Sequence, residues 1–382
     1  MTRIPHSSSC LIMCLWAAAL VAAPVPAPIP PPPTIDANAY VLLDYASGTV
    51  LAEKNVNERV EPASITKIMT IYTVATEIRD GRISLDDEVP ISEKAWRTSG
   101  SRMFVEVGKR VRVQDLMKGD IIQSGNDASV ALAEYVSGTE DVFAAVMNQH
   151  ANRLGMTGTH FLNSTGLPNP EHYTTARDVG VLAAALIREF PHVYAWFSEK
   201  EFTWNGIRQP NRNKLLYRDD TVDGIKTGFT ESAGYCLAAS AVRDGRRLIA
   251  VVLGTASDKA RTAAASALLN YGFRFTESHR VYGAREPVTE VRVWKGEGEI
   301  ARLGLGDELH VSVPSGRYES VEATVNVDPR VVAPVSAGQT LGHLTLALDG
   351  EEIAARDLVS LDDIAEAGIF TRMLDEVRLW FE

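Results

Sequence analysis

Two side chains with complementary chemistry lie one helical turn apart near the start of this chain. Ser64 carries a hydroxyl nucleophile and Lys67 an amine that could deprotonate it, within Pro62-Ala63-Ser64-Ile65-Thr66-Lys67. Residues three apart share a helix face, and the positive end of a helix dipole favours negative charge that develops nearby. The spacing therefore predicts an activated serine. Because a chance Ser-x-x-Lys is common, the motif needs support from the rest of the chain.

Helix, turn and strand signals surround this serine and two further polar segments. Pro62 and Ser64 are good helix openers, and apolar residues continue at helical spacing from Ile68 to Ala75. Ser124-Gly125-Asn126-Asp127 is flanked by apolar residues that suit helices, so it should form the turn between them. Lys226-Thr227-Gly228 lies in a segment with the pattern of a strand.

Strand patterns before and after these helices predict one antiparallel sheet packed by helices, a mixed α/β (α+β) fold. The strands are expected at Ala39–Leu43, Thr49–Ala52, Gly224–Phe229, Tyr235–Val242 and Arg247–Thr255. Helices are expected at Val142–Leu154, Thr174–Ile187 and Asp258–Tyr271, and two short strands at Val105–Gly108 and Val111–Val113.

The pattern changes after Tyr282, where short segments alternate apolar and polar residues. These segments are Val288–Val293, Glu308–Val313, Tyr318–Val327, Thr340–Leu348 and Ile353–Val359. Short strands at regular spacing predict a small β-sandwich. From Ile364 to Glu382 an amphipathic helix follows, with large aromatic residues at its end. It is a candidate for lying in a membrane interface, and packing against its own domain is the alternative.

Charge and cysteine content exclude several classes of function. The net charge of −11 argues against a nucleic-acid partner, which would require a clustered basic surface. Two of the three cysteines, Cys10 and Cys14, lie in an N-terminal apolar run that reads as an export signal. Cys236 is then alone in the mature chain, in a segment typical of a buried strand, and no disulfide within the chain is expected. Since no Cys/His cluster has metal-ligand spacing, we predict no metal and no cofactor.

The three polar motifs together are far more specific than any one of them. In the order Ser64-x-x-Lys67, Ser124-Gly125-Asn126 and Lys226-Thr227-Gly228, they resemble those of the active-site serine penicillin-binding proteins and β-lactamases. More closely, the chain resembles the D-alanyl-D-alanine carboxypeptidases among the low-molecular-mass penicillin-binding proteins. That closer resemblance rests on Gln209–Asn213, on Lys226–Ala239 and on the C-terminal β domain with its terminal helix.

The resemblance implies a catalytic role for three residues. Ser64 would be the nucleophile that forms an acyl-enzyme, and Lys67 its base. Lys67 can act as a base only if its pKa is lowered, which desolvation and a second cation, Lys226, would do. Ser124 would relay a proton to the leaving nitrogen.

The resemblance also implies residues that hold the substrate. Asn126 would orient Lys67 and bind the peptide carbonyl, and Lys226 and Thr227 would hold the substrate carboxylate. Gly228 would let the strand backbone approach closely. The backbone N–H groups of Ser64 and Phe229 would form the oxyanion site.

Two further residues need separate comment. Arg261 matches an arginine that helps to bind the terminal carboxylate in the family, although a plain surface arginine is a close alternative. Phe229 stands where relatives often have histidine. Because the oxyanion role needs only its backbone, acylation should survive, and we expect the change to affect substrate preference or deacylation.

The resemblance implies removal of the terminal D-alanine from peptidoglycan stem peptides, with β-lactam antibiotics as inhibitors. An endopeptidase uses the same chemistry and stays open. A β-lactamase is a further alternative, but Asn163–Tyr173 lacks the Glu-x-x-Leu-Asn pattern that activates water in those enzymes. A non-catalytic envelope scaffold is the alternative from another class.

The expected organisation follows from these observations. The protein should be exported to the periplasm or cell envelope and lie on the outer face of the cytoplasmic membrane, with its terminal helix on the membrane surface. We expect a signal peptide at 1–23, a proline-rich spacer at 24–35, a serine peptidase domain at 36–280, a β-sandwich domain at 281–362 and the amphipathic helix at 363–382.

Overall fold

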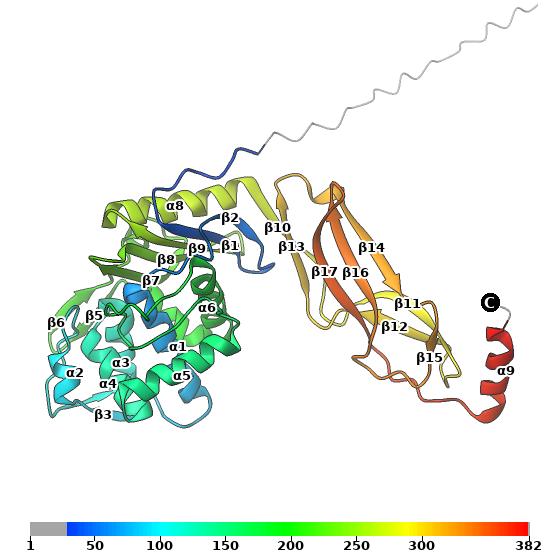
Figure 1. Cartoon of the computed structure of the whole chain (residues 1–382), viewed down its shortest axis with the longest axis horizontal. Helices are drawn as coiled ribbons and strands as arrows, with labels where there is room; N and C mark the ends of the chain where they lie inside the picture. The colour runs from blue at the N-terminus through cyan, green and yellow to red at the C-terminus, as the bar shows by residue number, and fades with distance from the viewer. Residues whose placement is uncertain (1–28, 381–382) are drawn as a thin grey trace, which may run out of the picture.

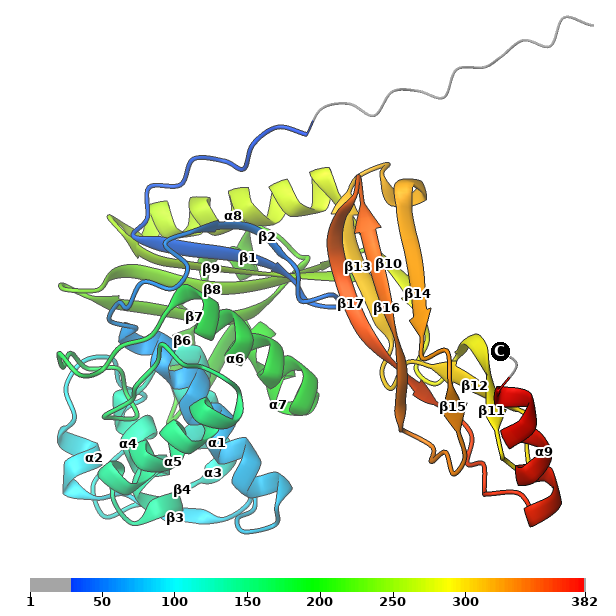
Figure 2. The same cartoon turned by 45° about the vertical axis from the view of Figure 1, so that its right-hand side comes forward.

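The computed structural model describes residues 29–380, so the predicted signal peptide and the first part of the spacer lie outside the described residues. The described chain forms two parts joined end to end (Figure 1). A larger part of helices and sheet contains all three polar motifs, and an elongated part made of strands follows it. The terminal helix α9 (Ile369–Leu379) lies at the far end of the second part in both views (Figure 2).

The first part is built around a five-stranded antiparallel sheet in the order β2-β1-β9-β8-β7. As predicted, both ends of this part contribute strands. The strands are β1 (Ala39–Asp44), β2 (Val50–Lys54), β7 (Val222–Thr230), β8 (Gly234–Arg243) and β9 (Arg246–Thr255).

Successive side chains of these strands enter two different cores. Val41 belongs to the larger core, and its neighbour Leu42 packs with Leu268 and Leu269 in the smaller one. The smaller core lies under α8 (Asp258–Phe275), which runs along one face of the sheet (Figure 2). Because both faces are covered, the central strands are apolar at nearly every position rather than alternating.

The remaining helices pack on the other face of the sheet and position the polar motifs. They are α1 (Lys67–Arg79), α2 (Glu93–Arg97), α3 (Val113–Lys118), α4 (Asn126–Ser137), α5 (Glu140–Arg153), α6 (Ala176–Glu189) and α7 (Pro191–Tyr194). Two small hairpins accompany them, β3 (Glu88–Pro90) with β4 (Arg110–Arg112) and β5 (Glu201–Trp204) with β6 (Ile207–Pro210).

The prediction of a strand at Val105–Gly108 is wrong. The N–H groups of Met103, Phe104 and Val105 instead donate to the buried carboxylate of Asp127, at 2.9, 2.9 and 3.1 Å. A segment whose N–H groups are bound by a carboxylate cannot offer them to a neighbouring strand. The pairing partner of β4 is β3, which the sequence pattern did not reveal.

The second part is a β-structure around its own core. A six-stranded sheet, in the order β14-β16-β17-β12-β11-β15, packs with the pair β10-β13. The strands are β10 (Thr276–Tyr282), β11 (Pro287–Trp294), β12 (Ile300–Gly304), β13 (Leu309–Pro314), β14 (Val321–Val327), β15 (Val331–Val332), β16 (Thr340–Leu348) and β17 (Glu351–Ser360). Sequence analysis missed β10, β12 and β15, and the boundary expected at residue 280 falls inside β10.

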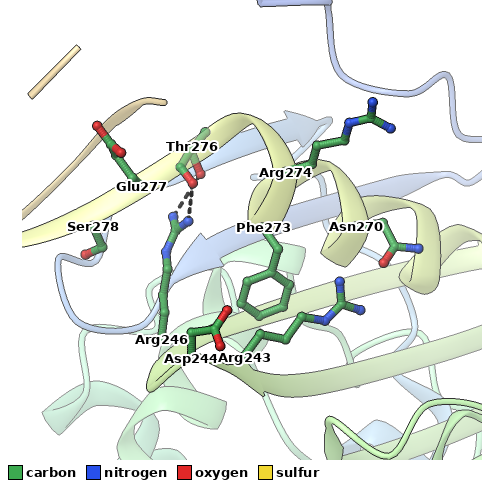
Figure 3. A pocket seen from close by; sticks show the side chains of 9 residues that line it. All are labelled: Arg243, Asp244, Arg246, Asn270, Phe273, Arg274, Thr276, Glu277 and Ser278. Atoms are coloured by element: carbon green, nitrogen blue, oxygen red, sulfur yellow. Dashed lines mark hydrogen bonds between the residues drawn. The ribbon is translucent and has the colours of Figure 1, made fainter. Parts of the chain in front are cut away.

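A buried ion pair lies where the two parts join. The guanidinium of Arg246 lies 2.8 Å from the carboxylate of Asp44, which is fully buried. Arg246 also donates to the backbone and the hydroxyl of Thr276, the first residue of β10 (Figure 3). The hydroxyl of Ser278, farther along β10, donates to Asp44 at 3.4 Å. Arg246, Thr276 and Ser278 line a cavity of about 740 Å³ beside the C-terminal end of α8 (Figure 3).

Candidate active site

Ser64 and Lys67 meet as their spacing predicts. Ser64 lies in the 3-10 turn Ala63–Thr66, which leads directly into α1, and Lys67 is the first residue of that helix. The ammonium nitrogen of Lys67 donates to Ser64 Oγ at 3.3 Å, to Asn126 Oδ1 at 2.7 Å and to the carbonyl of Thr165 at 2.6 Å. Ser64 is half-buried, whereas Lys67 is fully buried. The Ser64 hydroxyl is therefore accessible, while the neighbouring Lys67 amine is held by three hydrogen bonds.

The second motif follows a distorted helical segment. A π-helical turn, Gly119–Gln123, ends at Ser124, which adopts the left-handed conformation with φ +64°, and Asn126 begins α4. The Asn126 amide nitrogen donates to the carbonyl of Ser99 at 2.6 Å, which turns the amide oxygen toward Lys67. Ser124 is buried. Within residues 29–380, no hydrogen bond joins its hydroxyl to Lys67 or Lys226.

The third motif brings a second buried lysine to the site. Lys226 and Thr227 lie on β7, where Lys226 is only 2% exposed and donates to the Thr227 carbonyl at 3.1 Å. A Cβ at Gly228 would lie 3.0 Å from the carbonyl oxygen of Pro62 and 3.2 Å from the Cβ of Ala63. The close approach that Gly228 permits is therefore between β7 and the turn that carries the serine.

The two lysines hold their protons weakly. Burial lowers the pKa of Lys67 to about 8. Burial, together with the nearby charge of Lys67, also brings the pKa of Lys226 well below its ordinary value. Two ammonium groups in one buried region repel each other, so the site favours a state in which one of them is neutral.

The loop around Thr165 is part of the site, although sequence analysis did not assign it a role. Asn163 Oδ1 accepts from the N–H groups of Thr165 and Gly166, and this turn presents the Thr165 carbonyl to Lys67. A Cβ at Gly166 would lie only 1.8 Å from the carbonyl oxygen of Ala63. The turn-forming residues Asn-Ser-Thr-Gly were the available signal, but they did not indicate which side chain the loop would meet.

Glu140 holds the same loop. Its carboxylate accepts from the N–H and hydroxyl of Ser164 at 3.1 and 2.8 Å, and it pairs with Lys94 at 2.9 Å. One of its oxygens therefore binds the loop, and the other pairs with Lys94 on α2.

His172 was also missed, and it contacts the nucleophile's turn. Its Nδ1 accepts from the N–H of Leu162 at 3.0 Å, so Nε2 carries the proton and donates to the hydroxyl of Thr66 at 2.8 Å. Burial, reinforced by the nearby charges of His160 and Lys67, lowers the pKa of His172 to about 4. A neutral imidazole therefore supports the turn between Ser64 and Lys67.

Arg212 also contacts the site. It lies in the segment Gln209–Asn213, to which sequence analysis gave no role in the chemistry. Its Nε donates to the carbonyl of Gln123 at 2.8 Å, and its charge lowers the pKa of both Lys67 and Lys226. Nothing local in Gln209–Asn213 indicates this position, because the contact joins segments that are far apart in the sequence.

The guanidinium of Arg261 is engaged by the protein itself. It donates to the carbonyls of Gly228 and Cys236, at 2.8 and 3.2 Å, and pairs with Asp258. Arg261, on α8, thus links that helix to both β7 and β8. Cys236 is fully buried, as predicted, and burial raises its pKa to about 11.

Phe229 presents its side chain to solvent at the end of the third motif. The ring is 49% exposed, and its centroid lies 4.3 Å from that of Tyr235. An exposed aromatic ring therefore borders the site.

Comparisons with known proteins agree with this geometry. A sequence model described as D-alanyl-D-alanine carboxypeptidase matches residues 27–257, and one for the C-terminal domain of penicillin-binding protein 5 matches residues 277–366. D-alanyl-D-alanine carboxypeptidase DacC of Escherichia coli is 43% identical over 357 residues, which cover 91% of this chain and 89% of that protein.

Solved structures give the same result. Penicillin-binding protein 5 from Haemophilus influenzae superimposes with a TM-score of 0.85 at 40% identity, covering 88% of this chain and 99% of that one. Penicillin-binding protein D2 from Listeria monocytogenes, in an ampicillin-bound form, matches at 29% identity with a TM-score of 0.59, covering 63% of this chain and 98% of that one.

Proposed function

Because the chain belongs to the D-alanyl-D-alanine carboxypeptidase family, we propose that Ser64, Lys67 and Ser124 carry out its reaction. The protein is a serine-type D-alanyl-D-alanine carboxypeptidase, a hydrolase. The observation that carries the residue assignment is the Lys67 amine, which is buried, has a lowered pKa and is hydrogen-bonded to the accessible hydroxyl of Ser64.

Acylation begins when Ser64 Oγ attacks the carbonyl of the penultimate D-alanine and its proton passes to neutral Lys67. The C–N bond to the terminal D-alanine then breaks, and the leaving nitrogen takes a proton through the Ser124 hydroxyl. Water hydrolyses the resulting ester and restores the Ser64 hydroxyl. The fixed position of the Lys67 amine supports its role as the base, because the three hydrogen bonds hold it beside Ser64.

The other site residues position the substrate. Lys226 and Thr227 hold its terminal carboxylate, and Asn126 binds its peptide carbonyl. The N–H groups of Ser64 and Phe229 stabilise the oxyanion.

Arg261 adds positive charge behind β7 through its bond to the Gly228 carbonyl. Peptidoglycan stem peptides ending in D-alanyl-D-alanine are the substrate class, and an endopeptidase activity on cross-links would use the same residues.

β-Lactams should acylate the same serine and remain bound. The loop Asn163–Tyr173 lacks the Glu-x-x-Leu-Asn pattern of the β-lactamases that share these motifs, and its one carboxylate, Glu171, is exposed. The nearby buried carboxylate of Glu140 is engaged by Ser164 and Lys94. This arrangement favours slow release of the drug over the rapid turnover of a β-lactamase. The ampicillin-bound form of the Listeria protein supports binding of the same class of inhibitor here.

The terminal helix supports a place on a membrane surface in the cell envelope. The polar side of α9 is attached to Lys295, the residue after β11, since Asp375 accepts from the N–H of Lys295 at 2.8 Å and Glu376 pairs with the Lys295 amine. Its apolar side faces outward, with Phe370 87% and Trp380 84% exposed. Within residues 29–380, no helix has the length and apolar character needed to cross a bilayer. We infer peripheral attachment through α9 rather than a spanning anchor.

Mass spectrometry tests the residue assignment directly. The signal-free protein and its Ser64→Ala variant are incubated with benzylpenicillin, while D-alanine release is followed from a peptide ending in D-alanyl-D-alanine. We expect a long-lived adduct on Ser64 and D-alanine release, both lost in the variant. Rapid penicillin turnover would instead support a β-lactamase. A variant that kept its cellular effect without either activity would support the scaffold alternative.

A further inference from the structure

Asp120 is a buried carboxylate that the proposed mechanism does not use. It lies in the π-helical turn that leads to Ser124 and is fully buried. One oxygen accepts a hydrogen bond from the Ser129 hydroxyl, and the other has no hydrogen-bond partner in residues 29–380. Because an ionised carboxylate in a protein interior is costly without compensation, a nearby positive charge must balance it.

The compensating charges are the two active-site lysines. Among the anions that favour the protonated form of Lys67, Asp120 has the largest effect, and it also favours the protonated form of Lys226. Reciprocally, both lysines favour the ionised form of Asp120, whose pKa burial raises to about 6.

The other charged groups that act on this pair of lysines are engaged elsewhere. Asp127 binds three backbone N–H groups, and Glu140 binds Lys94 and Ser164. Two arginines have the opposite effect: the charge of Arg212 favours loss of a proton from each lysine, and that of Arg261 favours loss of a proton from Lys226. Asp120 is thus the carboxylate near the lysines that makes neither an ion pair nor a backbone hydrogen bond.

The Lys67–Lys226 pair can carry two, one or no protons, and the charge of Asp120 affects which of these states is favoured. Mutual repulsion disfavours the state in which both are protonated, and burial alone favours the state in which neither is. An ionised Asp120 favours the intermediate state, because one ammonium and one carboxylate are neutral overall. Acylation requires a one-proton state with Lys67 neutral as the base and Lys226 charged, and a substrate carboxylate beside Lys226 favours the proton there.

We propose that Asp120 is a positioning residue of the acylation site: it is the counter-charge that keeps a single proton on the Lys67–Lys226 pair. This inference rests on the proposed roles of the two lysines. Without the carboxylate, the first and the second proton of the pair are both lost at lower pH, so both limbs of the pH profile move in the acid direction.

The test is the pH profile of acylation of the full mature chain by benzylpenicillin, followed by intact mass. For Asp120→Asn we expect both limbs to shift to lower pH by about one unit or more. Ser129→Ala is the matched control, since it removes the hydrogen bond to Asp120 and leaves the carboxylate charge. Because the Ser129 hydroxyl favours the ionised form of Asp120, its loss weakens the counter-charge without removing it, and the limbs should move less than in Asp120→Asn.

The results that would overturn the role of Asp120 differ from those that would overturn the proposed function. A slower Asp120→Asn enzyme with unmoved limbs would make Asp120 merely structural and overturn the proposal. Absence of an adduct on the unmutated protein would overturn the proposed function itself.

Asp120→Leu, which leaves no buried polar atom behind, provides a second variant and should show the same shift. If neither variant folds, carbon NMR of lysine Cε in the unmutated protein decides the question. The two lysines should lose their protons at well-separated pH values, and loss of both protons over the same pH range would contradict the proposal.

Discussion

At the scale of single residues, the proposed chemistry depends on neighbouring residues that do not react with the substrate themselves. Lys67 differs from an ordinary surface lysine because it is fully buried and its three donor positions face Ser64, Asn126 and Thr165. His172 is a comparable case, since its neutral ring holds the Thr66 hydroxyl between the nucleophile and its base. Both depend on burial, which shifts a pKa and fixes a hydrogen-bond direction at the same time.

The neutral state of His172 makes stability depend on pH. The pKa of His172 is about 4 in the folded chain and about 6.5 in the unfolded chain. In mildly acid solution the imidazole is therefore protonated in the unfolded chain but not in the folded one. The free energy of unfolding should therefore fall by about 2 kcal/mol from this residue between pH 7.5 and pH 5. Urea unfolding at the two pH values measures it.

His172→Gln is the matched variant for this measurement. Glutamine can still accept from the Leu162 N–H and donate to Thr66, but it has no titrating ring. The variant should lose less stability on acidification than the unmutated protein. An equal loss in both would assign the acid sensitivity to other groups.

At the scale of elements, each motif is placed by a local distortion rather than by regular structure. The serine lies on a 3-10 turn before α1, Ser124 follows a π-helical turn, and β7 can approach the serine turn because Gly228 has no side chain. The terminal helix α9 shows the opposite arrangement. It is regular, but its apolar side faces away from the protein.

Substitution of an apolar residue on α9 tests whether this side binds lipid. Burying a phenylalanine side chain contributes about 2 kcal/mol, so Phe370→Ser should weaken binding to phosphatidylcholine–phosphatidylglycerol vesicles by roughly tenfold or more. Co-sedimentation of the full mature chain with vesicles measures the affinity. Val325→Ser, a similar change at a half-exposed position of β14, is the control and should leave binding unchanged. Equal binding by all three proteins would exclude α9 as the attachment.

At the scale of the whole molecule, the distance between the active site and α9 depends on the joint between the two parts. Arg246 on β9 contacts Asp44 on β1 and Thr276 at the start of β10, and the hydroxyls of Ser47 and Ser312 meet across the same joint at 2.8 Å. These contacts fix the direction in which β10 leaves α8 (Figure 3). A peptidase held on a membrane by α9 would work at a defined height above it.

Arg246→Ala should loosen this joint. The variant leaves Asp44 buried without its ion pair, which costs about 3–5 kcal/mol and should lower the melting temperature. Small-angle scattering at a temperature where the variant is folded should show a broader distribution of maximum dimensions. Acylation by soluble benzylpenicillin should persist, because the contacts of Lys67 lie elsewhere. Arg280→Ala, at an exposed arginine, is the control. Unchanged scattering and stability in Arg246→Ala would show that other contacts hold the joint.

Much of the fold follows from pattern alone. The long strands and helices of the first part were predicted close to their observed bounds, because apolar periodicity reports which face of an element is buried. The short elements β3, β5, β6, α2 and α7 were not predicted. The failures were short or polar elements. β10 follows α8 without a break, and its half-buried residues alternate only weakly. The segment at Val105–Gly108 has a strand-like composition, but Asp127 binds the N–H of Val105 and those of the two residues before it.

The sequence by itself determined the pair that we propose as reacting groups, because Ser64 and Lys67 are one helical turn apart and local geometry brings them together. It also determined the three motifs and their order, and with them the family. Only the tertiary structure decided what surrounds the Lys67 amine. The carbonyl of Thr165 is 98 residues away along the chain, and Asp120, His172 and Arg212 come from other elements. Burial and long-range contacts set the pKa of a buried amine, and neither can be read from residue spacing.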